Sequence, residues 1–422
     1  MTLLLKNLCE PGVSTRLSRV LFSEDVSSDD TRDLIFDAAA DMVSEAERFG
    51  VKGDLWELFF AVAVILDENP VCRVYERRLA QNDIFRMLAQ DLWKMHRRLK
   101  AVKEMVDADE RFEPLRTMRD FSPRNEAAHL RQKHSYNDIL LLASRFAAAS
   151  SPNEMAAALG VFCEKRGIGK FALEAAFTWN SVSKSLIPVN DRDPHTLSSL
   201  IGYESQKAEL LANTESFLFG NPSNNVLLFG DSGAGKSTSV RALLNEPDFV
   251  GRGLRVIELR GDQFGDIPEI LRLIRERNYR FILFMDDLSF EEYEVGYKHL
   301  KALIEGGLER KPDNTVIYAT SNRRKIIREV WKDRAANSGD VHGRDTTQEK
   351  QSLADRFGLT IWYPSVSKEE YLSMVRMIAE EMGLVIEDSE METVAMRWEL
   401  ERGFTGRAAR QFVCHMLLRQ AR

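Results

Sequence analysis

Apolar residues recur at helical spacing through roughly the first 175 positions of the chain. Beyond the cap-rich segment 27–30, small and apolar residues fall on one helical face, namely Ile35, Ala38, Ala39, Met42 and Ala46. Segments 82–95 and 135–146 repeat this spacing, and each begins with Asn or Ser close to an Asp. No fixed-period repeat stands out. The pattern predicts an all-α N-terminal region and, by itself, indicates no function.

The most apolar segment, LWELFFAVAVIL at 55–66, predicts a buried helix and not a membrane span. It contains Glu57 and is well short of the ~20 residues that a span needs. A helix that is apolar on nearly all sides is expected inside a helical core. The opening MTLLLK is too short for the apolar region of a signal peptide. We therefore expect a cytoplasmic protein that does not enter a membrane.

After the segment NDRDP at 190–194, the apolar pattern changes its period. Short β-rich runs now alternate with helical patterns, and these runs are NNVLLFG (224–230), LRVIEL (254–259), FILFMDD (281–287), TVIYATSN (315–322) and LTIWYP (359–364). Near-continuous apolar strands separated by helices predict a parallel sheet covered on both faces. From Ser365 onward only helical patterns appear. The chain is thus expected to contain a helical domain at 1–188, an α/β core at 189–364 and C-terminal helices at 365–422, and we assign partner engagement to the helical domain as a hypothesis that the pattern itself does not test.

Composition narrows the class of protein further. Hydrophobic residues make up 44% and charged residues 29% of the 422 positions, as in soluble globular proteins. The net charge of −7 provides no general basic field for nucleic acid, so direct binding to DNA or RNA is not favoured. The cysteines Cys9, Cys72, Cys163 and Cys414 are far apart, without the spacing of a zinc site or a disulfide framework.

The segment GDSGAGKS at 230–237 matches the phosphate-binding loop G-x-x-x-x-G-K-[ST] in full. Its glycines allow backbone N–H groups to converge on phosphates at the start of a helix. Lys236 would reach the β- and γ-phosphates, and Ser237 would bind Mg²⁺. The preceding apolar strand and the following helical pattern are the context that this motif requires. We expect ATP contacts from the whole loop and its exit, that is from Gly230, Asp231, Ser232, Gly233, Ala234, Gly235, Lys236, Ser237 and Thr238.

The apolar strand FILFMDD ends in Asp286 and Asp287, where it would emerge from the sheet. Asp286, fifty residues after Lys236, is expected to hold Mg²⁺ directly or through water. Asp287 follows directly and would orient the attacking water. The competing residues for that role are Glu291 and Glu292. A further alternative is a site that binds ATP and barely hydrolyses it.

Polar and basic residues at three later positions could complete the surroundings of the phosphates. Asn322, or its neighbour Ser321, ends a buried strand and could contact the γ-phosphate or its attacking water, with ordinary turn chemistry as the alternative. Arg356 precedes the fifth strand and could act on a neighbouring subunit as an arginine finger. Arg407, at the start of the last helical pattern, could reach back to the phosphates.

The order of these motifs resembles that of AAA+ ATPases. More narrowly, residues from about 160 to 422 resemble the bacterial AAA+ family catalogued as domain of unknown function 815, through IGYESQK, NTESFLFG, DDLSFEE, YKHLKALIEGGLE, PDNTVIYATSNRR, DRFGL and GRAARQF. The resemblance implies a five-stranded core in the order 5-1-4-3-2, a C-terminal helical lid, ATP, Mg²⁺ and a ring-like homo-oligomer. It implies no particular client.

The same resemblance implies roles for individual residues. Asn322 matches the sensor-one position, Arg356 the arginine finger and Arg407 sensor two. Gly202 and Tyr203 lie where such proteins frame adenine. Asp287 departs from the general Asp-Glu pattern, although Asp-Asp is usual in the narrower family.

We therefore expect an ATP hydrolase that works at subunit interfaces to remodel or load an unknown macromolecular partner. The alternative is a nucleotide-gated binding module, a loader or regulator associated with DNA, with little hydrolysis of its own. A small-molecule P-loop kinase would need a substrate pocket in place of Arg356 and Arg407, so the sequence disfavours it.

Overall fold

The computed structural model describes residues 13–22, 29–76, 84–124, 136–189, 192–288, 311–322 and 357–420. The chain forms two compact units, Met1–Ala175 and Ala176–Arg422. No helix in the described part of the chain is both long and apolar enough to cross a membrane.

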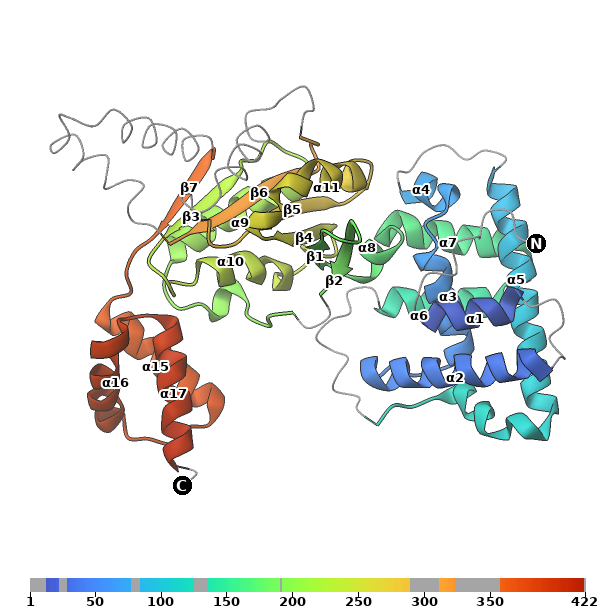
Figure 1. Ribbon diagram of the computed structural model, residues 1–422, viewed down its shortest axis with the longest axis horizontal. Coiled ribbons are helices and arrows are strands. Elements are labelled where there is room, and N and C mark those ends of the chain that lie inside the picture. Colours follow the sequence, from blue (N-terminus) through green and yellow to red (C-terminus); the bar gives the residue numbers. More distant parts are fainter. Residues whose placement is uncertain are drawn as a thin grey trace. The chain divides into compact units, whose positions relative to one another are not determined.

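The N-terminal unit is built from helices (Figure 1). Those described are α1 (Val13–Phe22), α2 (Asp29–Phe49), α3 (Leu55–Leu66), α4 (Pro70–Glu76), α5 (Ile84–Ala108), α6 (Tyr136–Ala148), α7 (Pro152–Arg166) and α8 (Lys170–Leu173), with the 3₁₀ segment η1 (Glu110–Asp120). The helical segments predicted at 55–66, 82–95 and 135–146 fall on α3, α5 and α6 and are confirmed. The apolar face predicted on α2 is buried.

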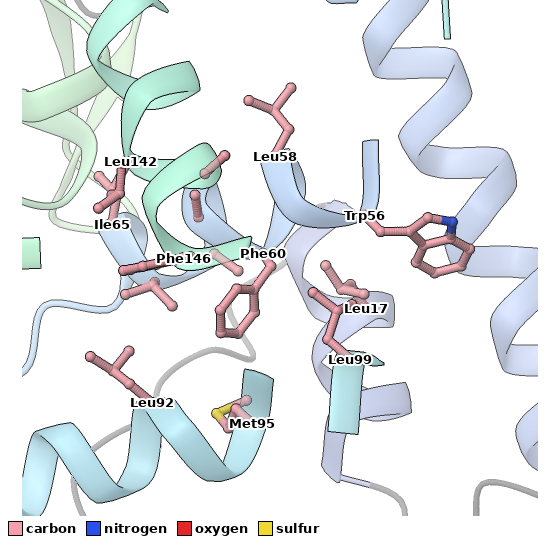
Figure 2. Close-up of a cluster of buried hydrophobic side chains, with 14 of the residues drawn as sticks. Leu17, Trp56, Leu58, Phe60, Ile65, Leu92, Met95, Leu99, Leu142 and Phe146 are labelled. Atoms are coloured by element: carbon pink, nitrogen blue, oxygen red, sulfur yellow. The ribbon is translucent and has the colours of Figure 1, made fainter. Parts of the chain in front are cut away.

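Helix α3 lies at the centre of the N-terminal core (Figure 2). The helix begins after Asp54, whose Oδ1 accepts hydrogen bonds from the N–H groups of Trp56 at 3.1 Å and Glu57 at 3.3 Å. Most of its side chains are buried, and the ring of Phe60 packs 5.7 Å from that of Phe146 on α6. The prediction of a buried helix at this position is therefore confirmed.

A cluster of charged groups is buried in the same core. Lys103 of α5 donates hydrogen bonds to Oε1 of Glu57 and to Oδ2 of Asp54, both at 2.7 Å. His96 Nε2 lies 3.3 Å from Oε2 of Glu57, without hydrogen-bond geometry. Burial raises the pKa of Glu57, but the neighbouring His96 and Lys103 outweigh burial and keep this pKa below its usual value. Lys103 thus compensates two carboxylates at the start of α3 and ties them to α5.

The second unit contains a seven-stranded sheet in the order β2-β1-β4-β5-β6-β3-β7. Its strands are β1 (Ala176–Asn180), β2 (Ser185–Pro188), β3 (Val226–Gly230), β4 (Leu254–Leu259), β5 (Arg280–Met285), β6 (Thr315–Ser321) and β7 (Leu359–Tyr363). Neighbouring strands are parallel except in the antiparallel hairpin β1–β2. The strands predicted from the sequence are β3 to β7, which are neighbours in the order β7-β3-β6-β5-β4.

The sheet is larger than expected because the hairpin β1–β2 extends one edge. β1 pairs in parallel with β4, as Phe177 does with Ile257, and β2 pairs with β1. This hairpin lies at 176–188, inside the range that the sequence analysis assigned to the helical domain 1–188. The expected five strands are therefore corrected to seven, and the hairpin belongs to the second compact unit, which begins at Ala176. Strands of five and four residues are too short for their periodicity to reveal them.

Helices lie on both faces of the sheet (Figure 1). The described helices of this part are α9 (Glu204–Leu218), α10 (Lys236–Ala242) and α11 (Ile267–Ile274), with the 3₁₀ segments η3 (Leu197–Ser199), η4 (Leu243–Asn245) and η5 (Gly261–Asp266). The chain runs from β3 to β4 through α10 and back to β5 through α11, so right-handed crossovers place these helices on opposite faces.

The segment after Ser365 is helical, as predicted. It contains α15 (Lys368–Met382), α16 (Asp388–Arg402) and α17 (Gly406–Gln420). These helices pack around an apolar core of their own, in which Tyr371 and Phe412 are fully buried.

Candidate functional site

The predicted phosphate-binding loop connects β3 to α10. Gly230 ends β3 and Lys236 begins α10, while Gly233 and Gly235 between them have positive φ angles of +78° and +87°. A Cβ atom at Gly230 would lie 2.0 Å from the carbonyl oxygen of Tyr363 in β7. The loop conformation therefore requires glycine both for its backbone angles and for its packing against the neighbouring strand.

Lys236 is the buried cation of this loop. Its Nζ donates hydrogen bonds to the carbonyl oxygens of Gly230 at 3.0 Å and Asp231 at 2.7 Å, and to Oδ1 of Asn322 at 2.9 Å. Burial lowers the pKa of Lys236, and nearby carboxylates, Asp287 first among them, offset this only in part. An anionic group bound next to Nζ would supply the charge compensation that this ammonium lacks.

Asp286 follows β5 directly and is held by three side chains. Its Oδ1 accepts hydrogen bonds from the hydroxyls of Ser237 at 2.5 Å and Thr320 at 2.7 Å. Its Oδ2 accepts from the Arg241 guanidinium at 2.9 Å, and Arg241 also pairs with Glu258 of β4 at 3.0 Å. The structure thus brings the loop hydroxyl and the predicted magnesium acid together, as the sequence indicates, and adds an ion-pair network beside them.

Asp287 lies next to Asp286 and has an unusual backbone conformation. Its φ angle is +54°, in the left-handed region, and its N–H donates to the Thr320 hydroxyl at 2.8 Å. Its exposed carboxylate accepts a hydrogen bond from Nδ2 of Asn322 at 2.5 Å. Asp tolerates this backbone region better than most residues with a Cβ, because its short side chain forms local hydrogen bonds. The shorter acid therefore suits a position where the backbone turns.

The donor set at this edge of the sheet fits a magnesium-bound nucleotide. Ser237 and Asp286 supply the hydroxyl and carboxylate oxygens that Mg²⁺ prefers. Lys236 and the N–H groups of the glycine-rich loop would supply the positive groups that a phosphate requires. Asn322 brings an amide next to both Lys236 and Asp287.

The start of α17 lies against the phosphate-binding loop. Thr405 begins this helix, because its hydroxyl accepts from the N–H of Ala408 at 3.0 Å. A Cβ atom at Gly233 would lie 3.0 Å from the Cβ of Thr405. Arg407, the predicted sensor, is exposed in the first turn of the same helix. The structure therefore places the helix start that carries Arg407 beside the loop.

Gly202 and Tyr203 precede α9, and both have positive φ angles, +75° and +62°. The Tyr203 ring lies 4.9 Å from that of Tyr363, and its hydroxyl donates to the carbonyl oxygen of Pro364 at 3.1 Å. Burial raises the pKa of Tyr203 to about 12. These contacts tie the segment to the end of β7, and a role in binding adenine stays a prediction.

Some predicted residues lie outside the described residues, namely Arg356, Glu291 and Glu292. Others at the site were missed by sequence reasoning, namely Thr320, Arg241 and Glu258. The sequence spacing to a predicted site residue could have identified Thr320 and Arg241. Arg241 is four residues after Ser237 on α10, so these two share a face of the helix, and Thr320 of β6 is two residues before Asn322, which directly follows that strand. Glu258 had no such signal, because only the pairing of β4 with β5 brings it near Asp286.

A family model described as Protein of unknown function (DUF815) matches residues 172–420, more than half of the chain. The match includes the whole of the sheet and the C-terminal helices. No curated protein matches this sequence.

Several solved structures match part of the chain. Thermotoga maritima RuvB, titled a Holliday junction branch migration motor, has 21% identity and a TM-score of 0.35, and the match covers 52% of this chain and 62% of that one. C. elegans PCH-2 has 15% identity and a TM-score of 0.35, with 50% and 62% covered. The FIGL-1 AAA domain in complex with ADP has 17% identity and a TM-score of 0.35, with 52% and 72% covered. The chain thus spans less than two thirds of the RuvB and PCH-2 chains.

Proposed function

This chain belongs to the family described as Protein of unknown function (DUF815), and from its site we propose that it is an AAA+ ATPase. It binds ATP with Mg²⁺ and hydrolyses ATP at subunit interfaces, and it uses hydrolysis to remodel or load a macromolecular partner. The C-terminal helices act as the lid of the nucleotide site, and the N-terminal helices engage the partner.

The observation that carries this proposal is the meeting of three segments at the ends of parallel strands. The loop after β3 brings Lys236 and Ser237, the end of β5 brings Asp286 and Asp287, and the end of β6 brings Asn322. Hydrogen bonds link all five side chains into two groups, Lys236–Asn322–Asp287 and Ser237–Asp286. A cation, a hydroxyl, two acids and an amide in this order are the groups that phosphoryl transfer needs.

Each residue has a distinct role in the proposed reaction. The loop from Gly230 to Thr238 binds the phosphates through its N–H groups, with Lys236 as the fixed cation. Ser237 and Asp286 hold Mg²⁺, which when bound offsets negative charge on the phosphates. Asp287 orients the attacking water through its carboxylate, and Asn322 holds that carboxylate.

A second candidate is a nucleotide-gated switch or DNA-associated loader with little hydrolysis. The observation that favours it is the engagement of Asp287 by Asn322, which itself binds Lys236. If the hydrogen bonds Lys236–Asn322 and Asn322–Asp287 persist when nucleotide is bound, the Asp287 carboxylate stays bonded to Asn322 and does not contact the attacking water. The net charge of −7 counts against direct duplex binding in this case.

Replacing Lys236 tests the phosphate site. Lys236→Ala removes a charged hydrogen-bond donor, which contributes roughly 1.5–3 kcal/mol, so the Kd for ATP should rise at least tenfold. Calorimetric titration with Mg²⁺ and ATP measures the Kd, and circular dichroism checks the fold. Lys184→Ala is the matched control, since that lysine pairs with Asp266 and is remote in sequence from the loop. Unchanged ATP affinity in folded Lys236→Ala would contradict the proposal.

A further inference from the structure

One hydroxyl, that of Thr320, contacts both acids of the candidate site. Its Oγ1 lies 2.7 Å from Oδ1 of Asp286 and 2.8 Å from the backbone nitrogen of Asp287. Thr320 is 1% exposed and belongs to β6, which lies between β5 and β3 inside the sheet. A hydroxyl so deeply buried on a central strand has a fixed position and little competition from water.

The chemistry of the two contacts fixes their direction. A backbone N–H can only donate, so the Thr320 hydroxyl accepts from Asp287. The single hydrogen of the hydroxyl then goes to Asp286, whose ionised carboxylate can only accept. Close by, the N–H of Leu288 donates to the carbonyl oxygen of Thr320 at 2.7 Å. Thr320 therefore joins the carboxylate of Asp286 to the left-handed turn at Asp287.

We propose that Thr320 is a positioning residue for hydrolysis, which fixes the water-orienting acid Asp287 relative to the magnesium acid Asp286. The inference rests on the proposed function, in which the two acids have these roles. A residue with a φ of +54° keeps that conformation only where surrounding contacts hold it. Without the hydroxyl, the N–H of Asp287 loses its acceptor, and the turn that directs the carboxylate relaxes.

The two hydrogen bonds of the hydroxyl account for a threonine at this position in place of an apolar strand residue. Valine has nearly the same shape and would suit a buried strand, but it offers neither the acceptor nor the donor. Serine keeps both. Thr320→Val and Thr320→Ser therefore separate the hydroxyl from the volume of the side chain.

The test compares kcat and the Kd for ATP in the full chain with Mg²⁺. Thr320→Val should lower kcat by about 10²-fold, the loss that a ~1 Å displacement of a catalytic group produces, while the Kd stays unchanged. Thr320→Ser should keep most of the wild-type kcat. If Thr320→Val fails to bind ATP because it does not fold, Thr320→Ala is measured in its place with the same expectation for kcat.

Thr315→Val is the matched control, because Thr315 is on the same strand, is also 1% exposed, and bonds Asn314 instead of an acid. Its kcat should stay at the wild-type value. Equal kcat in Thr320→Val and wild type, or an equal loss in Thr315→Val, overturns the inference and leaves the proposed function standing. Wild-type protein that binds ATP without any turnover overturns hydrolysis as the function, and the inference with it.

Discussion

At the scale of the residue, Asp287 combines a left-handed backbone conformation with a short acidic side chain. Its φ of +54° lies in the left-handed region, and its carboxylate accepts a hydrogen bond from Asn322. The same conformation suits Asp better than Glu, since short polar side chains are enriched there. An Asp in place of Glu therefore fits the backbone conformation at this position.

Asp287→Asn tests whether this acid orients water. The change keeps the left-handed turn, which Asn also tolerates, but removes the carboxylate charge. We expect kcat to fall by about 10²–10⁴-fold with ATP still bound, the range for loss of a general base. Single-turnover hydrolysis measures the rate.

Asp248→Asn is the control for that substitution, because Asp248 is also an exposed aspartate with positive φ, +64°, in a turn after η4. It should leave kcat unchanged. Normal hydrolysis in Asp287→Asn together with an inactive Glu291→Gln would transfer the role to Glu291.

At the scale of the element, the buried charge cluster joins α3 to α5 in the N-terminal unit. The pKa of Glu57 is lowered from its usual 4.5, because His96 and Lys103 outweigh the opposing effect of burial. A carboxyl group with a lowered pKa in the folded state stabilises the fold at pH values above its usual pKa. This contribution is lost as the pH falls through the lowered pKa. The N-terminal helices should therefore open more readily in acid.

The opening is measured by hydrogen exchange of α3 peptides in the full chain at pH values decreasing from 4.5. Glu57→Gln should remove part of the pH dependence of the opening free energy. Lys103→Met leaves two carboxylates without their cation and should cost roughly 3–5 kcal/mol at neutral pH. Lys100→Met, an exposed lysine on the same helix, should cost far less. A pH dependence identical in Glu57→Gln and wild type would show that the cluster does not control stability.

At the scale of the whole molecule, the proposed reaction depends on assembly. β7 is at the edge of the sheet, and Arg356 immediately precedes the described part of the chain that leads into it. If Arg356 serves the nucleotide of a neighbouring subunit, as we propose, part of the active site belongs to a second copy of the chain.

Mixing two inactive variants tests this sharing of a site. Arg356→Ala should bind ATP normally but hydrolyse it about 10³–10⁵-fold more slowly, the contribution of arginine fingers in related reactions. Adding Lys236→Ala subunits should restore activity in part, since mixed interfaces combine an intact loop with an intact arginine. Steady-state hydrolysis at increasing ratios of the two variants measures the recovery. Full activity of a strictly monomeric wild-type preparation would contradict a shared site.

Sequence alone located the parts of this protein that depend on neighbours along the chain. The glycines and Lys236 form one short segment, and Asp286 ends an apolar run, so each could be assigned without knowledge of the fold. The long helices α3, α5 and α6 also followed from their spacing of apolar residues. Helix propensity and apolar periodicity depend on residues about four positions apart or less. The loop, the end of the apolar run and the three helices are all defined by such local relations.

The tertiary structure decided which residues meet across strands. Thr320 and Glu258 reach Asp286 or its arginine only because β6 and β4 flank β5, and β1 exists as a strand because β4 offers it a partner. In the left-handed turn, the N–H of Asp287 likewise donates to the hydroxyl of Thr320, 33 residues later in the chain. Hydrogen bonds between distant segments form only once the sheet has fixed their register, and a pattern along one segment does not contain that register.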